Sequence, residues 1–370
     1  LTSVEFPADP AIEMIVVGEL VGVPTFLDED RGYVVGADGL PEAQGTTRAP
    51  FRVVVPAGTG DYRFVMYGHG TGGNHLDPAF DEDLAAGGIA KVGTRLYGWT
   101  DADVILTFAN LQYMAQGSFA AAGFLVEGLA HAAAIQRAMS GVISDLLAAD
   151  TIGGMPNPAA GRRPDGSRPM WVGGSLGGTA GLIYAAADPE IRYAVVNVPG
   201  AAWSQWVWHS VTMEMRHDLI AVHYDDDIDL ATALTIAQTN LDLADGASWV
   251  DVLEESPTAF LVQESMGDPI LPNPGTEMVA VVAGARQVGG IFESIRGLEP
   301  ADEVIEGSGI TQFQAPPGSI FEVHGFAARD SLAGFAAREQ ILEFVTTALE
   351  GRSRIVAPPS CPASGCDFGP

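Results

Sequence analysis

The segment 170–178 (MWVGGSLGG) carries the strongest chemical signal in the sequence. It places an apolar run before the pattern G-x-S-x-G, and small residues follow at 178–181. A strand that turns abruptly into a helix strains the serine backbone and exposes its hydroxyl, and flanking glycines avoid collisions that a Cβ would cause. The N-terminal N–H groups of such a helix also favour developing negative charge. We predict that Ser175 is a nucleophile; the alternative is a tight strand-to-helix turn without chemistry.

This arrangement resembles the nucleophile turn of the α/β-hydrolase family. The resemblance implies a mainly parallel central sheet flanked by helices, and a serine, an acid and a histidine in that chain order. It also implies an oxyanion-binding loop after an early strand. Because G-x-S-x-G alone is a weak pattern in a chain with 45 glycines, the remaining parts have to be found in the same order.

The resemblance places the base after Ser175, where four of the seven histidines lie. Three of these four fall within 199–256, which interrupts the regular alternation of elements. His324 alone follows a late apolar run, 320–323, and precedes an expected helix. We therefore predict that His324 is the general base; a structural histidine at a strand end is the alternative.

The acid is expected on a loop between Ser175 and His324. The segment 259–270 supplies an apolar strand followed by a G-D-P turn, so we predict that Asp268 accepts the Nδ1 proton of His324. Glu264 is the rival acid, but it lies at the strand end, where its reach to a neighbouring histidine is shorter. Asp268 as the simple start of a proline turn remains the alternative without chemistry.

The oxyanion donors are expected in two places. One is the backbone N–H of Leu176, the residue after the nucleophile. The other is the sequence H-G-T-G-G at 69–73, which resembles the family's oxyanion loop and assigns the N–H of Thr71, with Gly70 as second choice. We also predict that His69 contacts the substrate. A phosphate-binding loop is disfavoured because the Walker lysine is absent.

Apolar, β-branched runs alternate with helical stretches, which is typical of a mainly parallel α/β sheet. The predicted strands are 51–55, 63–67, 104–108, 170–172, 193–198, 259–262 and 320–323. Long helices are predicted at 126–149 and 331–349, each with one apolar face, and an antiparallel extension of the sheet edge is predicted within 12–35.

We predict a single α/β-hydrolase domain over 1–370 with two insertions and a tail at 355–370. The insertion 199–256 is a candidate cap or lid, and its Trp203 and Trp206 are candidate substrate contacts, although ordinary packing is equally compatible. The second insertion, 284–318, is rich in Gly and Pro. The acidic run from Asp225 to Asp229 lacks the D-x-D-x-D-G pattern, so we predict no metal site.

The charge balance is strongly acidic, with 18 Lys plus Arg against 47 Asp plus Glu and a formal net charge of −29. This excludes a nucleic-acid groove or a polybasic membrane anchor as the main activity, since both need clustered positive charge. At 47% hydrophobic and 18% charged residues, the chain is too apolar for disorder. No run of 18 uncharged apolar residues appears, so we expect no transmembrane segment.

The two cysteines, Cys361 and Cys366, lie close together in the tail. A small disulfide there would indicate an oxidising compartment, whereas two free thiols would indicate the opposite. The sequence begins without Met or a signal pattern, and we expect an extracellular or periplasmic protein whose signal sequence is absent here.

Together these features predict a serine-dependent carboxylic ester hydrolase, an esterase or lipase most similar to secreted bacterial lipases. The expected substrate is an ester, whether small molecule, lipid or polyester, and no cofactor is required. The same residues would also serve a serine peptidase or thioesterase. A non-catalytic binding protein on a hydrolase scaffold is the alternative from another class.

Overall fold

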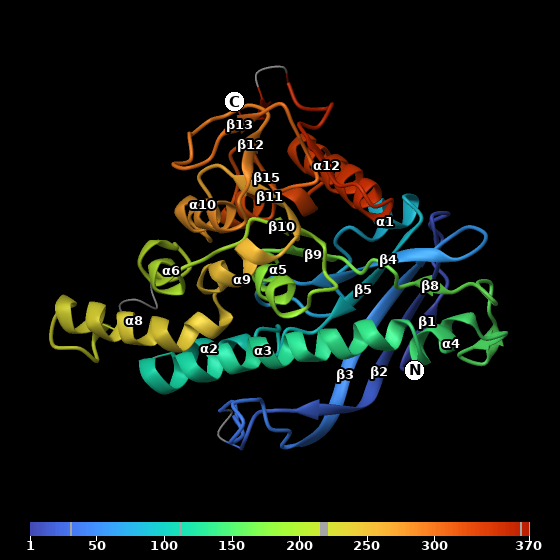
Figure 1. Ribbon diagram of the computed structural model, residues 1–370, viewed down its shortest axis with the longest axis horizontal. Helices are drawn as coiled ribbons and strands as arrows, with labels where there is room; N and C mark the ends of the chain where they lie inside the picture. The colour runs from blue at the N-terminus through green and yellow to red at the C-terminus, as the bar shows by residue number, and fades with distance from the viewer. Residues whose placement is uncertain (30–31, 112, 215–220, 363–364, 370) are drawn as a thin grey trace.

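The computed structural model describes residues 1–370 except 30–31, 112, 215–220, 363–364 and 370. In this part of the chain, one large sheet forms the centre, with the strand order β1-β2-β3-β5-β4-β9-β10-β11-β15-β12-β13. Two further strands join it, because β8 pairs with β4 and β17 pairs with β15. Helices lie on both sides of the sheet, as Figure 1 shows.

The strands of this sheet come from the whole length of the chain, and helices separate them mainly between β4 and β12. They are β1 (Ser3–Glu5), β2 (Ile12–Thr25), β3 (Gly45–Pro56), β4 (Tyr62–Gly68), β5 (Ile89–Thr94), β8 (Pro164–Asp165), β9 (Trp171–Gly174), β10 (Tyr193–Asn197), β11 (Ala259–Ser265), β12 (Arg286–Val288), β13 (Pro300–Ala301), β15 (Gly309–Gln314) and β17 (Cys366–Asp367). Two small antiparallel pairs stand apart from it: β6 (Thr151–Ile152) with β7 (Met155–Pro156), and β14 (Glu303–Ile305) with β16 (Arg354–Val356).

The sheet is parallel from β5 to β13 and antiparallel at the edge formed by β1, β2 and β3. This confirms the predicted α/β class with an antiparallel extension at one edge. In the parallel part, Gly174 of β9 lies beside Asn197 of β10, and Asn197 lies beside Gln263 of β11. The carboxyl ends of these strands therefore meet at one edge, where side chains of the following loops can converge.

The helices and short 3₁₀ turns connect the strands and cover both faces. They are α1 (Asp81–Ala86), α2 (Val104–Asn110), α3 (Met114–Met139), α4 (Val142–Ala148), α5 (Leu176–Ala187), α6 (Trp203–His209), α8 (Asp227–Leu241), η1 (Asp242–Ala244), η2 (Gly246–Trp249), α9 (Val250–Glu255), α10 (Asn273–Val282), α11 (Ile320–His324), η3 (Phe326–Ala328) and α12 (Leu332–Leu349). Ser331 caps α12 by accepting the N–H of Gly334, so this helix begins close to its predicted start.

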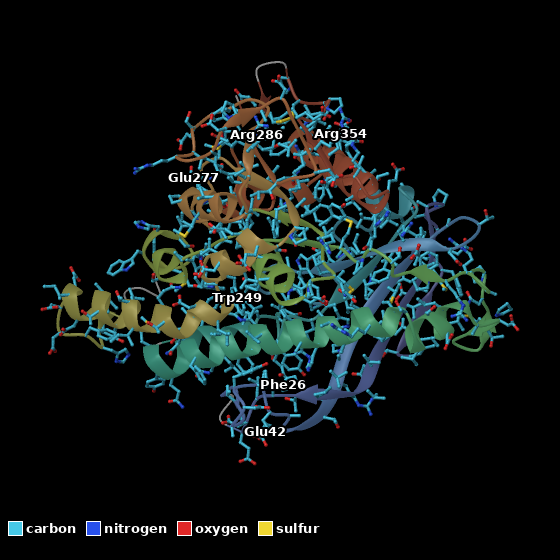
Figure 2. The ribbon with its side chains drawn as sticks, in the orientation of Figure 1. Phe26, Glu42, Trp249, Glu277, Arg286 and Arg354 are labelled. Carbon is cyan, nitrogen blue, oxygen red and sulfur yellow. A yellow bond between two sulfur atoms is a disulfide. The ribbon has the colours of Figure 1, made fainter. Side chains whose placement is uncertain are left out.

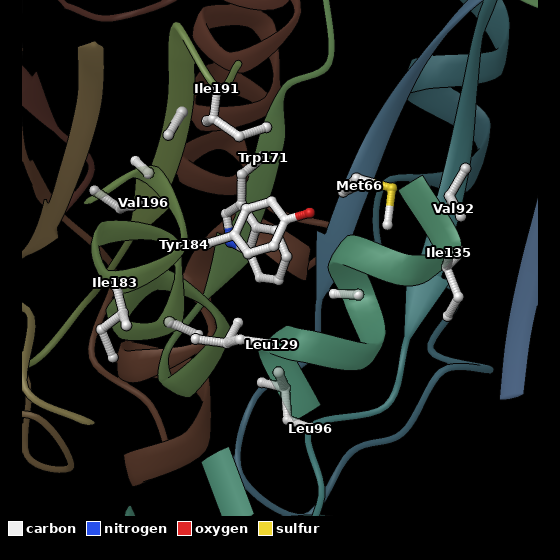
Figure 3. Packing of buried hydrophobic residues seen from close by; sticks show 14 of the residues in the cluster. Met66, Val92, Leu96, Leu129, Ile135, Trp171, Ile183, Tyr184, Ile191 and Val196 are labelled. Atoms are coloured by element: carbon white, nitrogen blue, oxygen red, sulfur yellow. The ribbon is translucent and has the colours of Figure 1, made fainter. Parts of the chain in front are cut away.

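The core has two layers because successive strand residues face opposite sides of the sheet. In β4, Met66 packs with α3 and α5 in one layer, while Tyr67 packs on the side covered by α12. Figure 3 shows the first layer, in which Trp171 and Tyr184 stack between β9 and α5, and Leu129 of α3 lies nearby. Both faces of the sheet are thus buried, as expected for parallel strands.

Two predicted strands are helices instead. Residues 104–108 form α2, and 320–323 lie in α11. The second error has a clear physical cause, because Ser319 and Glu322 form a capping box in which each side chain bonds the other residue's backbone N–H. This local cap starts a helix despite the strand-like run that follows it.

The prediction that 284–318 is an insertion was wrong, since it contains β15, which lies between β11 and β12 in the sheet. The strand was hidden by its polar residues Thr311 and Gln312, which are buried but hydrogen-bonded. The strand β5 was missed as well, because its buried Lys91 interrupts the apolar run. The predicted helix 126–149 is divided into α3 and α4.

The segment 199–256 lies between β10 and β11 and holds α6, α8, η1, η2 and α9, while its residues 215–220 lie outside the described part. Its acidic run starts α8, since Asp226 accepts the N–H groups of Ile228 and Asp229.

The C-terminal tail is held to the sheet because β17 pairs with β15, and it contains the predicted Cys361–Cys366 disulfide. In Figure 2 the C-terminal region around Arg286 and Arg354 lies opposite the segment with Phe26 and Glu42.

Among the described residues, one helical stretch, Gln116–Met139 of α3, is long and apolar enough to cross a membrane by length and composition. However, 67% of its most apolar window is buried inside the protein. Leu125, Leu129 and Ala132 of this stretch belong to the main core, which accounts for its composition.

A buried charge cluster anchors the start of α1 to the sheet. The Asp81 carboxylate accepts two hydrogen bonds from Arg52, at 3.0 and 2.6 Å, and its Oδ1 lies 2.5 Å from Lys91 Nζ. Lys91 also donates to the carbonyls of Asp77 and Ala79, so it holds the chain that follows the H-G-T-G-G loop. All three charged side chains are at least nine-tenths buried.

We expect Asp81→Asn to lower the free energy of unfolding by about 3 kcal/mol or more, because it leaves two buried cations without their anion. Urea unfolding of the purified variant measures this. The control is Asp83→Asn, whose carboxylate is 39% exposed and pairs with Arg338, and which should cost less than about 1 kcal/mol. Equal losses in the two variants would contradict the prediction.

Candidate active site

Ser175 lies at the abrupt turn from β9 into α5. Its backbone has φ 57° and ψ −122°, in the region that residues with a Cβ rarely adopt. The N–H of Ser175 donates to the carbonyl of Asn197 at 2.9 Å, which ties the turn to β10. Such a strained conformation persists only where surrounding contacts impose it.

Those contacts explain the two glycines of the motif. A Cβ on Gly177 would lie 1.9 Å from the carbonyl oxygen of Gly68 at the end of β4. A Cβ on Gly173 would lie 2.2 Å from the carbonyl oxygen of Gly177. Because both contacts are with backbone, no side-chain rearrangement could relieve them, and only glycine fits at either position.

The H-G-T-G-G loop lies against the serine. A Cβ on Gly70 would be 3.4 Å from Ser175 Cβ and 3.8 Å from its Oγ. Thr71 and Leu176 line the same cavity, one from this loop and one from the start of α5. The structure thus brings the predicted oxyanion residues to the side of the predicted nucleophile.

His69 was predicted to contact the substrate, but the structure gives it another place. It is fully buried, its Nε2 accepts the N–H of Leu96 at 3.0 Å, and its Nδ1 lies 2.7 Å from the Gly70 carbonyl oxygen. Since Nε2 accepts, Nδ1 carries the proton and donates to Gly70. Burial lowers the pKa of His69 to about 4, so the ring is neutral. Its place is structural, because it fixes the loop from beneath.

His324 and Asp268 form the pair that the sequence predicted. The two atoms His324 Nδ1 and Asp268 Oδ2 lie 2.6 Å apart, and both residues are more than 90% buried. The other carboxylate oxygen accepts the N–H groups of Ile270 and Leu271, which fixes the acid on its loop. An acceptor at Nδ1 places the ring proton there and leaves Nε2 able to accept another proton.

His324 reaches this position from the end of α11 and not from a strand. The hydroxyl of Ser265, the last residue of β11, donates to the carbonyl of Val323 at 2.7 Å. This bond ties the histidine's helix to the strand that precedes the acid loop. His324 thus pairs with Asp268 as predicted, although its secondary structure was predicted wrongly.

His324 Nε2 is buried and has no hydrogen-bond partner among the described residues. Ser175 Oγ is therefore not bonded to it in this structure. The parallel register of β9, β10 and β11 nevertheless brings both loops to one edge of the sheet. Leu176, which follows the serine, and Leu271, which follows the acid, line one cavity.

Glu264, the rival acid, points into a different network. Its carboxylate accepts hydrogen bonds from Asn273 at 2.8 Å and from Gln312 at 2.9 Å. Burial raises the pKa of Glu264 to about 7, while these two hydrogen bonds oppose the rise. Asn273 also donates to the carbonyl of Ser265 and accepts the N–H of Gly267. Glu264 therefore stabilises the loop that carries Asp268 indirectly, through Asn273.

A cavity of about 440 Å³ opens beside the serine turn, within the size range of small-molecule sites. The indole rings of Trp203 and Trp206 line it, together with Leu271 and Met278. Among the described residues on its wall, His209 is the only one with an ionisable side chain. Trp203 and Trp206 thus lie where the sequence predicted, whereas Leu271 and Met278 gave no signal beyond being apolar.

Three observations together identify the fold. They are the strand order, the turn at Ser175 between β9 and α5, and the chain order of Ser175, Asp268 and His324. The chain has the α/β-hydrolase fold. No family model and no curated protein matches the sequence. The fold assignment depends on the features above and not on the similarities that follow.

Several solved structures are similar to the chain at low identity. An acylaminoacyl peptidase from Pyrococcus horikoshii has 12% identity and a TM-score of 0.48, over 91% of this chain and 41% of that one. An acetyl xylan esterase from Paenibacillus sp. R4 has 17% identity and a TM-score of 0.43, over 81% and 78%. A thermostable esterase from Pseudomonas putida ECU1011 has 16% identity and a TM-score of 0.43, over 80% and 72%. The chain thus spans less than half of the peptidase and most of each esterase.

The raised pKa of Glu264 predicts a pH-dependent stability. Between pH 4.5 and 7 the folded protein holds a proton on Glu264 that the unfolded chain releases, so the free energy of unfolding falls as pH rises across this window. In Glu264→Gln the fall between pH 5 and pH 8 should be smaller, by up to about 3 kcal/mol. Urea unfolding at both pH values measures it. The exposed Glu299→Gln serves as control, and an unchanged pH dependence in Glu264→Gln would refute the expectation.

Proposed function

We propose that the protein is a serine hydrolase that cleaves carboxylic esters through an acyl-enzyme. The observation that carries this proposal is the 2.6 Å pair of His324 and Asp268, which leaves Nε2 ready to accept a proton at the edge of the sheet where Ser175 is held. A nucleophile, a base and an orienting carboxylate are what nucleophilic acyl transfer requires.

In the proposed reaction, Ser175 Oγ attacks the ester carbonyl while His324 Nε2 takes its proton. Asp268 keeps the proton of His324 on Nδ1 and stabilises the imidazolium that forms. The backbone N–H groups of Leu176 and Thr71 bind the oxyanion, with Gly70 as the second choice in that loop. His324 then protonates the leaving alcohol, and water releases the acid by the reverse sequence. Apart from the hydrolytic water, every group that acts on the substrate in this scheme comes from the chain.

The character of the cavity supports an ester in preference to a peptide. A peptidase site commonly recognises charged or polar groups of its substrate, whereas this wall is mainly apolar, with indole rings, Leu271 and Met278, and His209 is its one ionisable side chain among the described residues. An uncharged acyl group suits such a wall because no polar group of the substrate is left unpaired. A thioesterase would use the same residues, and comparing rates on an oxygen ester, a thioester and an aminoacyl amide separates the three.

We also propose that the protein works outside the cytoplasm. The Cys361–Cys366 disulfide supports this, since such bonds persist in oxidising compartments. A net charge of −29 suits a soluble enzyme in salty water, where screening reduces repulsion between carboxylates.

Ser175→Ala should lower kcat/KM on a p-nitrophenyl ester by about 10⁴-fold or more, because no other group replaces the nucleophile. The variant should also lose labelling by a fluorophosphonate probe. The exposed Ser167→Ala is the matched control and should keep both activities. Full esterase activity in Ser175→Ala would disprove the proposed function, and a folded wild type that does not label would favour the non-catalytic alternative.

Asp268→Asn should lower kcat by about 10⁴-fold, because the amide no longer holds His324 in the required tautomer. Glu264→Gln should lower it less than tenfold, since Glu264 does not contact His324. Steady-state kinetics of the two variants with one ester decides between the two carboxyl groups. A larger loss in Glu264→Gln would reverse the assignment.

A further inference from the structure

The first turn of α6 carries Trp203, but it lacks a cap of its own. Ala202, at the N-cap position, has a left-handed backbone with φ 55° and no side chain that could accept a hydrogen bond. The first N–H groups of a helix need acceptors from elsewhere when the N-cap residue supplies none. The wall of the cavity formed by Trp203 thus depends on groups outside α6.

Two side chains from the segment after it provide these acceptors. Asp245, between η1 and η2, accepts the N–H of Trp203 on Oδ2 at 3.2 Å. Gln238, on α8, accepts the N–H of Ser204 on Oε1 at 2.8 Å. The Gln238 amide also donates to Asp245 Oδ2 at 3.0 Å, which links the two acceptors. The indole N–H of Trp203 donates to the carbonyl of Ala244 at 2.9 Å.

The carboxylate of Asp245 is well suited to this task. It is 1% exposed, and its Oδ1 accepts the N–H of Ala247 at 3.1 Å. Burial raises the pKa of Asp245, and the hydrogen bonds from Ala247, Gln238 and Trp203 oppose the rise. A buried carboxylate with this many donors holds them in a defined geometry.

The pair is also fixed relative to the nucleophile helix. A Cβ on Gly246 would lie 2.7 Å from Leu182 of α5, so the turn after Asp245 packs directly on the helix that begins at Ser175. Figure 1 shows α5 beside α9, on the side of the sheet that α3 also covers. The position of Trp203 is therefore connected to the turn at Ser175 through Asp245, the Gly246 turn and α5.

We propose that Asp245 and Gln238 are positioning residues that determine selectivity for the acyl group by holding Trp203 against the cavity. This proposal rests on the proposed ester hydrolysis at Ser175. Thr71 and Leu176 line the same cavity as Trp203 and Trp206. In this proposal an acetyl group occupies only the part beside Thr71 and Leu176, and a longer acyl chain extends to the indole wall. Loosening the wall therefore costs binding to long acyl chains and leaves short ones unaffected.

The test compares p-nitrophenyl acetate with p-nitrophenyl hexanoate in the wild type, Gln238→Ala, Asp245→Asn and the control Thr239→Ala. Thr239 is exposed beside Gln238 on α8. Fluorophosphonate labelling of Ser175 gives the concentration of active enzyme in each sample. The ratio of kcat/KM for hexanoate to that for acetate should fall at least about fivefold in the first two variants and stay unchanged in Thr239→Ala.

Three outcomes contradict the proposal in different ways. If both esters lose rate equally in a variant that labels normally, Asp245 and Gln238 do not act on acyl selectivity; if neither ester loses rate, they do not control the wall. A wild type that neither labels nor hydrolyses either ester overturns the proposed function itself. Should Asp245→Asn fail to fold, Gln238→Ala alone decides.

Discussion

The backbone contact among β4, β9 and α5 is the constraint on which the rest of the site depends. The carbonyl of Gly68 approaches Gly177 so closely that no other residue fits, and Gly173 and Gly177 meet in the same way. Because of this close approach the chain turns abruptly from β9 into α5, and Ser175 at the turn has a positive φ. A serine at such a turn has its hydroxyl exposed at the end of the strand. It also brings Gly70 beside the serine. The position of Ser175 and its closeness to the H-G-T-G-G loop are thus consequences of one steric constraint.

Asp268 and His324 are held in place in a different way, by a frame of buried polar groups that hydrogen-bond one another. Asn273 bonds the loop at Ser265 and Gly267, Glu264 bonds Asn273, and the hydroxyl of Ser265 bonds the helix that carries His324. Each member is satisfied, which buried polar groups require. The frame explains how Asp268 and His324 hold a defined geometry although they lie on a loop and a five-residue helix, since both are tied to the strand ends beneath them.

The sequence predicted those parts whose signals are local and failed where distant contacts decide. The turn at Ser175 was predicted because glycines, an apolar strand and small residues stand together within nine positions. The pairing of His324 with Asp268 was predicted from its place in the chain, but its strand-like surroundings are helical because Ser319 and Glu322 form a capping box. The strand β15 was missed because Thr311 and Gln312 look like loop residues until Gln340 and Glu264 are seen to satisfy them. The burial of His69 was likewise invisible, since Leu96 supplies its partner.

The place of Lys91, the only lysine among the 370 residues, has a consequence for the chemistry of the surface. Its ammonium group is enclosed by Asp81 and two carbonyls and is 1% exposed, so the folded protein offers no accessible side-chain amine. Positive charge at the surface is carried by guanidinium groups, which amine-directed reagents do not attack. Acylation, reductive methylation or cross-linking of a lysine therefore requires the sheet to open at β5. In this protein, a modified Lys91 would therefore show that the chain had opened at β5.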